Sequence, residues 1–294
     1  MTIDFKEITK DDKKIFDKYL KLTYHDNSAF NFTNFYMWRK YYQSRCVVED
    51  DVLFVKYGNK FLQPFCDAAQ IETAVKKIVD EYKKNPAEYI FINAEKNFVE
   101  QLVKISDLEF EILPQRDRFD YVYNTQNLIN LSGRKYHQKK NHVNAFKKLY
   151  PTAEYVSDFT DEVKKLCVDC LNIWYTERDL TEYPALPFER AAIIELLDDF
   201  DFFDIKGGAI ILDGKVVALS IGEQINSDTA VIHIEKADFD IKGAYAAINQ
   251  KFAQTWKDLS FINREEDLGI AGIRSAKESY RPVKMIEKFH IKLR

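Results

Sequence analysis

The chain lacks any long apolar run. No segment approaches the roughly 18 consecutive apolar residues that a membrane-spanning helix needs, and residues 1–7 contain no apolar core of a secretory signal. We therefore expect a cytoplasmic location. Cysteine is also scarce, and the four residues Cys46, Cys66, Cys167 and Cys170 are expected to be reduced thiols.

An excess of positive charge is missing as well. The 43 Lys and Arg residues are outnumbered by 47 Asp and Glu residues, giving a net charge of −4. This argues against a surface that is covered in positive charge and binds nucleic acid. The sequence has no Walker loop and no nucleophile elbow. His137 and His142 do not have the spacing of a metalloprotease pair, and Cys167-x-x-Cys170 has no second pair. No metal site is therefore predicted.

The composition indicates large cores and more than one domain. Hydrophobic residues make up 46% and charged residues 31% of the 294 residues, with 22 Phe and 17 Tyr. A typical domain has about 150 residues, so we predict two domains, 1–130 and 131–294. Residues 124–132 are the expected junction.

The predicted order of elements in the second half is informative. Helices are predicted over 135–149, 161–177 and 188–197, strands over 205–212, 216–225 and 229–234, then a helix over 243–259, a strand over 261–263, a helix over 270–279 and a strand over 285–293. Asp213-Gly214 is typical of a hairpin turn. A strand, a crossover helix and a further strand imply a right-handed parallel connection. This is the order of the acetyltransferase (GNAT) fold.

The first half follows a similar but less regular order, with its clearest helix over 71–84. We therefore predict an α/β (α+β) protein made of two tandem GNAT-like units. Each unit is expected to be a mixed sheet flanked by helices.

Residues 133–148 carry six Lys or Arg residues, two His and no acid. A helix of this kind can bind the phosphates of a lipid head group, a nucleotide or tRNA. The candidate binding residues are Arg134, Lys135, His137, Lys139 and Lys140. The other interpretation is a solvated helix face with Tyr136, Val143 and Phe146 turned inward.

A strand-to-helix turn lies within residues 231–249, where the predicted helix begins at Gly243 and Ala244. Backbone N–H groups at a helix N-terminus bind anions. In acetyltransferases the matching turn, Gln/Arg-x-x-Gly-x-Gly/Ala, holds the pyrophosphate of coenzyme A. Here Asp240 stands where Gln or Arg is expected, and Tyr245 where the second small residue is expected. An acid beside a pyrophosphate is unfavourable, so acetyl-CoA is the less favoured donor.

Three acids, Glu265, Glu266 and Asp267, follow the last short strand of the predicted fold and precede a helix with Arg274 and Lys277. The two cations are three residues apart and share a helix face. Acids in this place can simply stabilise the dipole of the helix. In the functional interpretation, the carboxylates bind an ammonium group and the cations bind a phosphate or carboxyl group.

Three motifs carry a specific resemblance: His233-Ile-Glu-Lys-Ala, Gly243-Ala-Tyr-x-x-Ile-Asn249, and Asn263-Arg-Glu-x-Asp-Leu-Gly-Ile-x-Gly-x-Arg-x-x-Lys-x-Ser-Tyr-x-Pro282. Together with residues 32–38 and 131–142, they resemble the C-terminal domain of phosphatidylglycerol lysyltransferases, and in particular stand-alone bacterial proteins of unknown function in that group. The resemblance covers nearly the whole chain. It implies a duplicated GNAT fold related to the Fem peptidyl transferases, which use aminoacyl-tRNA. The substrate-binding candidates within these motifs are Asn263, Glu235, Lys236, Tyr245, Asn249 and Tyr280.

We therefore expect an acyl or aminoacyl transferase with aminoacyl-tRNA as the donor. An amine or hydroxyl, such as that of an anionic lipid head group, would attack the ester carbonyl, and N–H groups near residues 233–235 would stabilise the oxyanion. Asp267 is expected to bind the donor's ammonium group or remove a proton, with Glu265 and Glu266 as alternates. Arg274 and Lys277 are expected to bind phosphate or the ester carbonyl. All these side chains should then share one water-accessible hollow.

Two other functions stay open. One is an acetyl-CoA-dependent N-acetyltransferase with coenzyme A at Gly243 and Ala244. The other is a non-catalytic binding module that recognises RNA or lipid through a degenerate site. The expected partners are tRNA and an anionic lipid head group, which would place the protein in the cytoplasm, peripheral to the inner face of the membrane.

Overall fold

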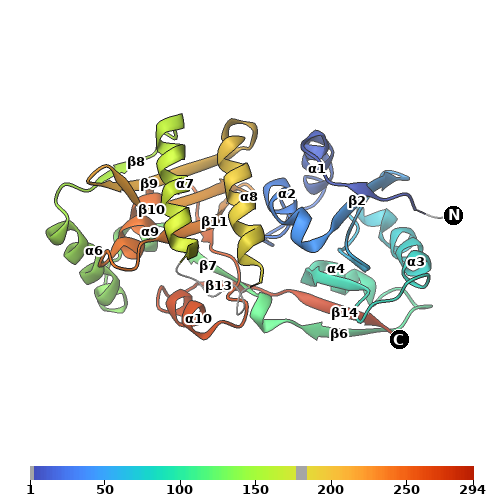
Figure 1. Ribbon diagram of the computed structural model, residues 1–294. Coiled ribbons are helices and arrows are strands. Elements are labelled where there is room, and N and C mark those ends of the chain that lie inside the picture. The colour runs from blue at the N-terminus through green and yellow to red at the C-terminus, as the bar shows by residue number, and fades with distance from the viewer. Residues whose placement is uncertain (1–2, 177–183) are drawn as a thin grey trace. The chain divides into compact units, whose positions relative to one another are not determined.

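The computed structural model describes residues 3–176 and 184–294, and the chain divides into two compact units (Figure 1). Unit 1 comprises the residues up to Asp120 together with Glu266–Gly269 and Ile286–Arg294. Unit 2 comprises Tyr121–Glu265 and Ile270–Met285. The predicted boundary divides the chain once, between residues 130 and 131. In the structure the chain is divided more than once, because Glu266–Gly269 and Ile286–Arg294 belong to unit 1 although the residues around them belong to unit 2 or follow it.

Unit 1 is built around a sheet whose described strands lie in the order β1-β2-β3-β4-β5-β14-β6. The strands are Lys6–Glu7 (β1), Ser44–Glu49 (β2), Val52–Tyr57 (β3), Lys60–Phe61 (β4), Phe91–Ala94 (β5), Phe110–Pro114 (β6) and Phe289–Leu293 (β14). The helices are Lys13–Leu20 (α1), Phe32–Tyr42 (α2), Ile71–Tyr82 (α3) and Lys96–Leu102 (α4). Helix α3 buries Ala74, Ile78 and Tyr82, which recur every four residues, in the core of this unit.

Unit 2 contains most of a second sheet, with the strand order β13-β7-β12-β11-β10-β9-β8. The strands are Asp120–Asn124 (β7), Glu154–Val156 (β8), Ile205–Leu212 (β9), Lys215–Gln224 (β10), Thr229–Ala237 (β11), Phe261–Asn263 (β12) and Lys284–Ile286 (β13). The helices are Thr125–Asn130 (α5), His137–Leu149 (α6), Asp161–Thr176 (α7), Leu186–Asp198 (α8), Ala244–Ala253 (α9) and Ala271–Glu278 (α10). In Figure 1, α7 and α8 cross the strands β9 to β11 on the side that faces the viewer.

The two sheets follow one plan. In each, an antiparallel meander ends in a strand that lies parallel to the strand after the next helix: β4 beside β5, and β11 beside β12. The predicted parallel connection in the second half is therefore confirmed. The predicted hairpin is confirmed too, because Asp213 and Gly214 both have positive φ and Leu212 pairs with Lys215. Each sheet is completed by a strand from a distant part of the chain, β14 against β5 and β7 against β12.

One detail of the predicted fold is wrong. The expected final strand over 285–293 is two strands, β13 and β14, which belong to different sheets. Most of the segment 124–132 is the helix α5, capped by the Asn124 side chain, with Leu128 and Leu131 buried in a core, and the junction expected there stays a prediction. The predicted helix over 161–177 is α7, and Glu177 lies outside the described residues. None of the described helices combines the length and apolarity needed to cross a membrane.

Candidate functional site in unit 2

Strands β11 and β12 pair over three residues and then separate. Their last parallel pair is Val231 with Asn263, whereas β11 continues to Ala237. Just beyond that pair, His233 is the extra residue of a β-bulge against β10. A Cβ on Gly222, on the opposing strand, would lie 2.3 Å from the Val231 carbonyl oxygen, so the close approach at this bulge requires glycine.

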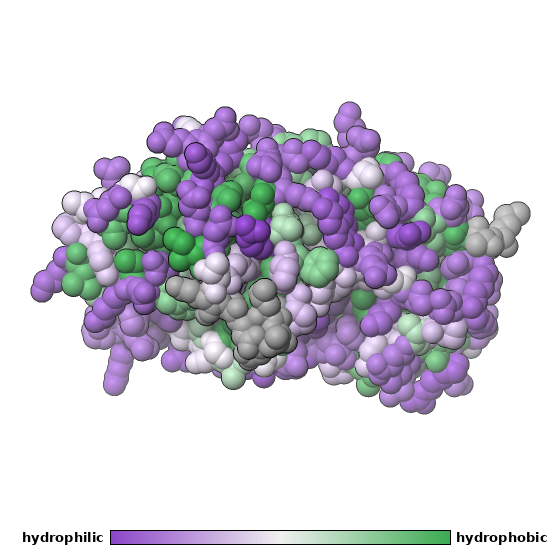
Figure 2. Space-filling model, viewed as in Figure 1, coloured by the Kyte–Doolittle hydropathy of each residue, from purple (hydrophilic) through white to green (hydrophobic). Residues whose placement is uncertain are grey.

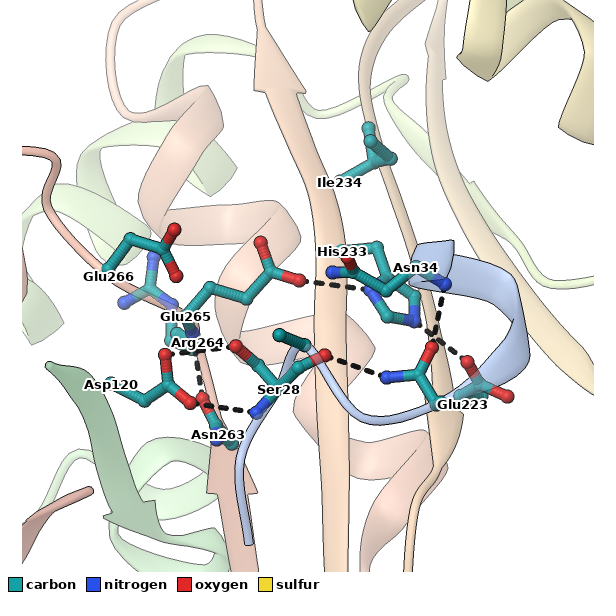
Figure 3. Close-up of polar contacts among 12 residues, drawn as sticks. Ser28, Asn34, Asp120, Glu223, His233, Ile234, Asn263, Arg264, Glu265 and Glu266 are labelled. Atoms are coloured by element: carbon teal, nitrogen blue, oxygen red, sulfur yellow. Dashed lines mark hydrogen bonds and ion pairs between the residues drawn. The ribbon is translucent and has the colours of Figure 1, made fainter. Parts of the chain in front are cut away.

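His233 lies between two carboxylates at this bulge (Figure 3). Its Nε2 is 2.9 Å from Glu223 Oε1, and its Nδ1 is 3.0 Å from Glu265 Oε1. Burial alone would lower the pKa of His233, but the hydrogen bonds to the two carboxylates outweigh it and raise the pKa to about 9. The imidazole is therefore a cation at neutral pH that donates to both neighbours, and it is not a general base.

Arg264, the residue after β12, reaches back to β11 across the separation. Its Nη2 donates to Glu235 Oε1 at 2.7 Å, and Asn249 Nδ2 of α9 donates to the other carboxylate oxygen at 2.9 Å. The guanidinium carbon lies 4.9 Å from the centre of the Tyr280 ring, and Lys139 Nζ of α6 lies 4.3 Å from the centre of the same ring. We call these five residues the Arg264 cluster.

Two buried polar atoms of the Arg264 cluster, Arg264 Nη1 and Asn249 Oδ1, have no hydrogen-bond partner among the described residues. A buried donor or acceptor without a partner costs about 1–3 kcal/mol, so native proteins keep few of them. One atom is a donor and the other an acceptor, and both side chains are held by the same Glu235 carboxylate. Together the two atoms offer one donor and one acceptor to a ligand, such as one with an ester carbonyl and an ammonium group.

The Arg264 cluster has two cationic side chains against one carboxylate. Burial and the neighbouring Arg264 lower the pKa of Lys139, although Glu235 opposes this. Burial also tends to lower the pKa of Arg264, but Glu235 more than compensates and raises it. The surplus of positive charge favours a ligand oxygen that carries or develops negative charge.

The basic segment divides between this cluster and the surface. Lys139 is half-buried and turns toward Tyr280. The other candidates are exposed: Arg134, Lys135, His137 and Lys140. Val143 and Phe146 are buried, as expected for the inner face of the helix.

Lys236 lies on the other face of the sheet. Its Nζ is 2.9 Å from Glu189 Oε2 of α8 and 3.8 Å from the centre of the Trp174 ring of α7. Trp174 Nε1 in turn donates to the Tyr245 hydroxyl at 3.0 Å. Because successive strand residues point to opposite faces, Glu235 and Lys236 cannot line one pocket. Figure 2 shows hydrophobic side chains among hydrophilic ones over α7, where Ile173 is 55% exposed.

Glu266 belongs to a buried ion-pair network in unit 1. Its carboxylate is 3.1 Å from Lys288 Nζ and 3.3 Å from Arg118 Nη1. Lys288 also lies 2.6 Å from Asp120, which accepts hydrogen bonds from Ser28 (Figure 3). Burial would lower the pKa of Lys288, but Asp120 and Glu266 reverse that and raise it. This network contains its own counter-charges and has the character of a structural element.

Asp267 is also in unit 1 and is fully buried. Its Oδ1 accepts from the backbone N–H of Gly269 at 2.8 Å, and its Oδ2 lies 3.2 Å from Arg116 Nη1. Gly269 has a positive φ of 76°. The carboxylate thus closes a tight turn, which is a common role for Asp. Its predicted role in ammonium binding or proton removal stays a prediction.

Lys277 and Asn263 hold the backbone after β12. Lys277 Nζ donates to the carbonyl oxygens of Arg264 and Glu265, and Asn263 Oδ1 accepts from the Glu265 N–H at 2.8 Å. Arg274 lies half-buried one turn earlier on α10. Lys277 therefore orients the segment that carries Arg264.

The expectation of one shared hollow for the three acids and the two cations stays a prediction. Among the contacts of the three acids, Glu265 bonds to His233, Glu266 to Lys288 and Asp267 to Arg116. Lys277 donates to the carbonyl oxygens of Arg264 and Glu265. These contacts differ because consecutive residues after a strand point in different directions.

The sequence analysis missed Arg264, Glu223 and the role of the His233 side chain. Arg264 stands inside the longest motif, between Asn263 and three acids, where it read as part of a charged turn. A cation directly after a buried strand indicates a candidate site residue, because such a side chain is half-buried and needs a partner. Glu223 gave no local signal, since the bulge brings it to His233.

The plan of the two sheets defines the fold class: the chain has a tandem GNAT fold, with two α/β units of mixed sheet flanked by helices. A tandem GNAT protein from the clavulanic acid biosynthesis pathway has the same fold, with a TM-score of 0.50 at 8% identity over 99% of this chain and 98% of that chain.

The chain matches the family "phosphatidylglycerol lysyltransferase, C-terminal" over residues 21–292, and it belongs to that family. A conserved protein of unknown function from Bacteroides thetaiotaomicron is 32% identical over all of both chains, with a TM-score of 0.91. The structure of L-PGS from Bacillus licheniformis has a TM-score of 0.66 at 12% identity over 95% of this chain and 90% of that chain. No curated protein matches the chain. The resemblance predicted from the motifs is confirmed, and the family and fold together support a transferase.

Proposed function

We propose that this protein is an aminoacyl or acyl transferase whose donor ester binds at the Arg264 cluster. Aminoacyl-tRNA is the proposed donor, and an amine or hydroxyl, such as that of an anionic lipid head group, is the proposed acceptor. The observation that carries the proposal is the pair of buried, unpartnered atoms Arg264 Nη1 and Asn249 Oδ1 where β11 and β12 separate. Membership of the lysyltransferase family supports the choice of donor.

The geometry suggests how an aminoacyl group would bind. Its carbonyl oxygen would accept from Arg264 Nη1, and its α-ammonium group would donate to Asn249 Oδ1. When the acceptor attacks the carbonyl, the negative charge that develops on the oxygen is stabilised by the guanidinium group. We assign the ammonium-binding role predicted for Asp267 to Asn249 and Glu235 instead, since Asp267 is occupied in a turn. The tRNA hydroxyl leaves with the acceptor's proton.

The exposed cations around α6 fit a polyanionic partner. Arg134, Lys135, His137 and Lys140 are exposed, and the segment 133–148 holds no acid. Such a surface attracts phosphates of tRNA or of an anionic membrane in a salt-dependent way. The local charge contrasts with a net charge of −4 for the chain.

Acetyl-CoA is a weaker candidate for the donor. Gly243 has a φ of 86°, and a Cβ there would lie 2.5 Å from the His142 carbonyl oxygen and 3.1 Å from Phe146. The need for glycine is therefore explained by packing against α6, with no appeal to a pyrophosphate. Asp240, near the start of α9, adds an unfavourable charge.

The test is a transfer assay with a pool of tRNAs charged with radiolabelled amino acids and vesicles of phosphatidylglycerol. Label in the lipid fraction is expected with the wild type and with Arg45→Lys, a matched variant at an exposed site on β2. Arg264→Lys should lose the label while remaining folded. No labelled product from any charged tRNA overturns the aminoacyl version. A thermal shift and product with acetyl-CoA, or saturable RNA binding without product, would favour the acetyltransferase or the binding module.

A further inference from the structure

Unit 1 contains a relay of hydrogen bonds that the proposed transfer does not use. Thr23 Oγ1 lies 2.8 Å from His25 Nε2, and His25 Nδ1 lies 2.7 Å from Glu95 Oε2. Thr23 is exposed, whereas His25 and Glu95 are 6% and 7% exposed. The relay thus runs from a surface hydroxyl through a buried imidazole to a buried carboxylate.

The position of the Glu95 carboxylate is fixed by further hydrogen bonds. Gln63 Nε2 donates to Glu95 Oε2 at 3.0 Å, and the Asn27 N–H donates to Oε1 at 3.4 Å. The Glu95 N–H donates back to Gln63 Oε1 at 3.0 Å. A carboxylate only accepts, so the hydrogen bond to Glu95 places a proton on His25 Nδ1, and Nε2 is the ring nitrogen that faces the Thr23 hydroxyl.

The imidazole is also packed on its sides. The rings of Phe30 and Phe65 lie 5.4 Å and 5.7 Å from the His25 ring, both in edge contact. These rings keep water away from the faces of the imidazole and hold its orientation. Next to Thr23, Leu22 is 40% and Tyr24 is 53% exposed, so the hydroxyl stands on an open, partly apolar surface.

We propose that Thr23, His25 and Glu95 form a nucleophile, base and orienting carboxylate that react with activated acyl esters. The hydroxyl, the base and the carboxylate have the order and spacing that nucleophilic catalysis requires. Thr23 Oγ1 attacks the ester carbonyl, and its proton passes to His25 Nε2. The C–O bond to the leaving alcohol breaks, and the alcohol takes that proton. Water then hydrolyses the Thr23 ester with His25 as the base, releasing a carboxylic acid. This reaction does not depend on the transferase site in unit 2.

The test is incubation of the full chain with p-nitrophenyl acetate, followed by nitrophenol release and peptide mass spectrometry. One acetyl group on Thr23 is expected in the wild type, and Thr23→Ser should keep the reaction. Thr23→Val should lose it, while the matched exposed variant Thr152→Val should behave as the wild type. His25→Gln should slow acylation by about 100-fold.

The readouts separate a chemical role from a structural one. Thr23→Val removes one hydroxyl at the surface, so its thermal midpoint should stay close to that of the wild type. If His25→Gln unfolds, the comparison of Thr23→Ser with Thr23→Val still tests whether Thr23 is the nucleophile. Equal nitrophenol release from wild type and Thr23→Val, or acetyl groups on lysines alone, overturns the proposal.

Discussion

The buried ion-pair network in unit 1 and the Arg264 cluster in unit 2 both combine cationic side chains with carboxylates, yet they differ in whether every polar atom has a partner. In unit 1, Lys288 has two carboxylate partners, and Ser28 donates to one of them. In the Arg264 cluster, one guanidinium nitrogen and one amide oxygen have no partner in the described structure. A buried network with matched charges holds a fold together, whereas unused hydrogen-bonding capacity in a buried cluster points to a ligand.

The largest effect is expected from Lys288→Met, which tests the structural role of the network in unit 1. The change removes the buried ammonium group that Asp120 and Glu266 share, and removing one partner of a buried pair costs about 3–5 kcal/mol. We expect the free energy of unfolding in urea to fall by that amount. A change below about 1 kcal/mol would contradict the structural role of this network.

The second substitution, Arg264→Lys, tests the Arg264 cluster. The lysine keeps the charge beside Glu235 but loses the second nitrogen, so the fold should survive while transfer falls by about 100-fold, a typical loss for one oxyanion donor. The rate of aminoacyl transfer and the thermal midpoint measure the two effects. A large loss of stability with an unchanged rate per folded molecule would make Arg264 structural, like Lys288.

The third concerns His233, whose raised pKa makes stability depend on pH. A group with a raised pKa stabilises the fold fully below its unfolded pKa, and this contribution is lost as the pH rises through the folded value. The span from 6.5 to about 9 corresponds to about 3 kcal/mol. The free energy of unfolding of the wild type should therefore fall across that window. His233→Gln should show a flatter profile, and an equally steep one would contradict the double ion pair.

The smallest expected effect is that of Asn249→Ala. It removes one hydrogen bond to the Glu235 carboxylate, which is worth about 1.5–3 kcal/mol for a charged acceptor, and it also removes a buried atom without a partner. The two terms oppose each other, so we expect a stability loss of only about 1 kcal/mol with a clear rise in KM for the donor. An unchanged KM would remove Asn249 from the site.

Local patterns predicted much of the fold. They did not predict how the strands near the C-terminus are divided between the two sheets. The meander β9 to β11, its Asp213-Gly214 turn and the parallel strand β12 follow from periodicity and turn chemistry. The division of residues 285–293 between two sheets does not, because the alternation of apolar residues is the same whichever sheet a strand joins.

The candidate site was predicted in part, through motifs. Glu235, Asn249 and Tyr280 were named from the resemblance, and Lys139 from its charge, and the structure brings these four together around Arg264. The contacts of the three acids were not predicted, because adjacency in sequence says little about the direction of side chains in a turn. His233 joined Glu223 only through a bulge, which no periodicity reveals.

A crystal structure with a non-hydrolysable amino-acid amide in place of the donor ester tests the central claim most directly. We predict the amide carbonyl oxygen within hydrogen-bonding distance of Arg264 Nη1, and the ammonium group on Asn249 Oδ1 and Glu235. Binding elsewhere, with the Arg264 cluster unchanged and empty at saturating amide, would contradict it.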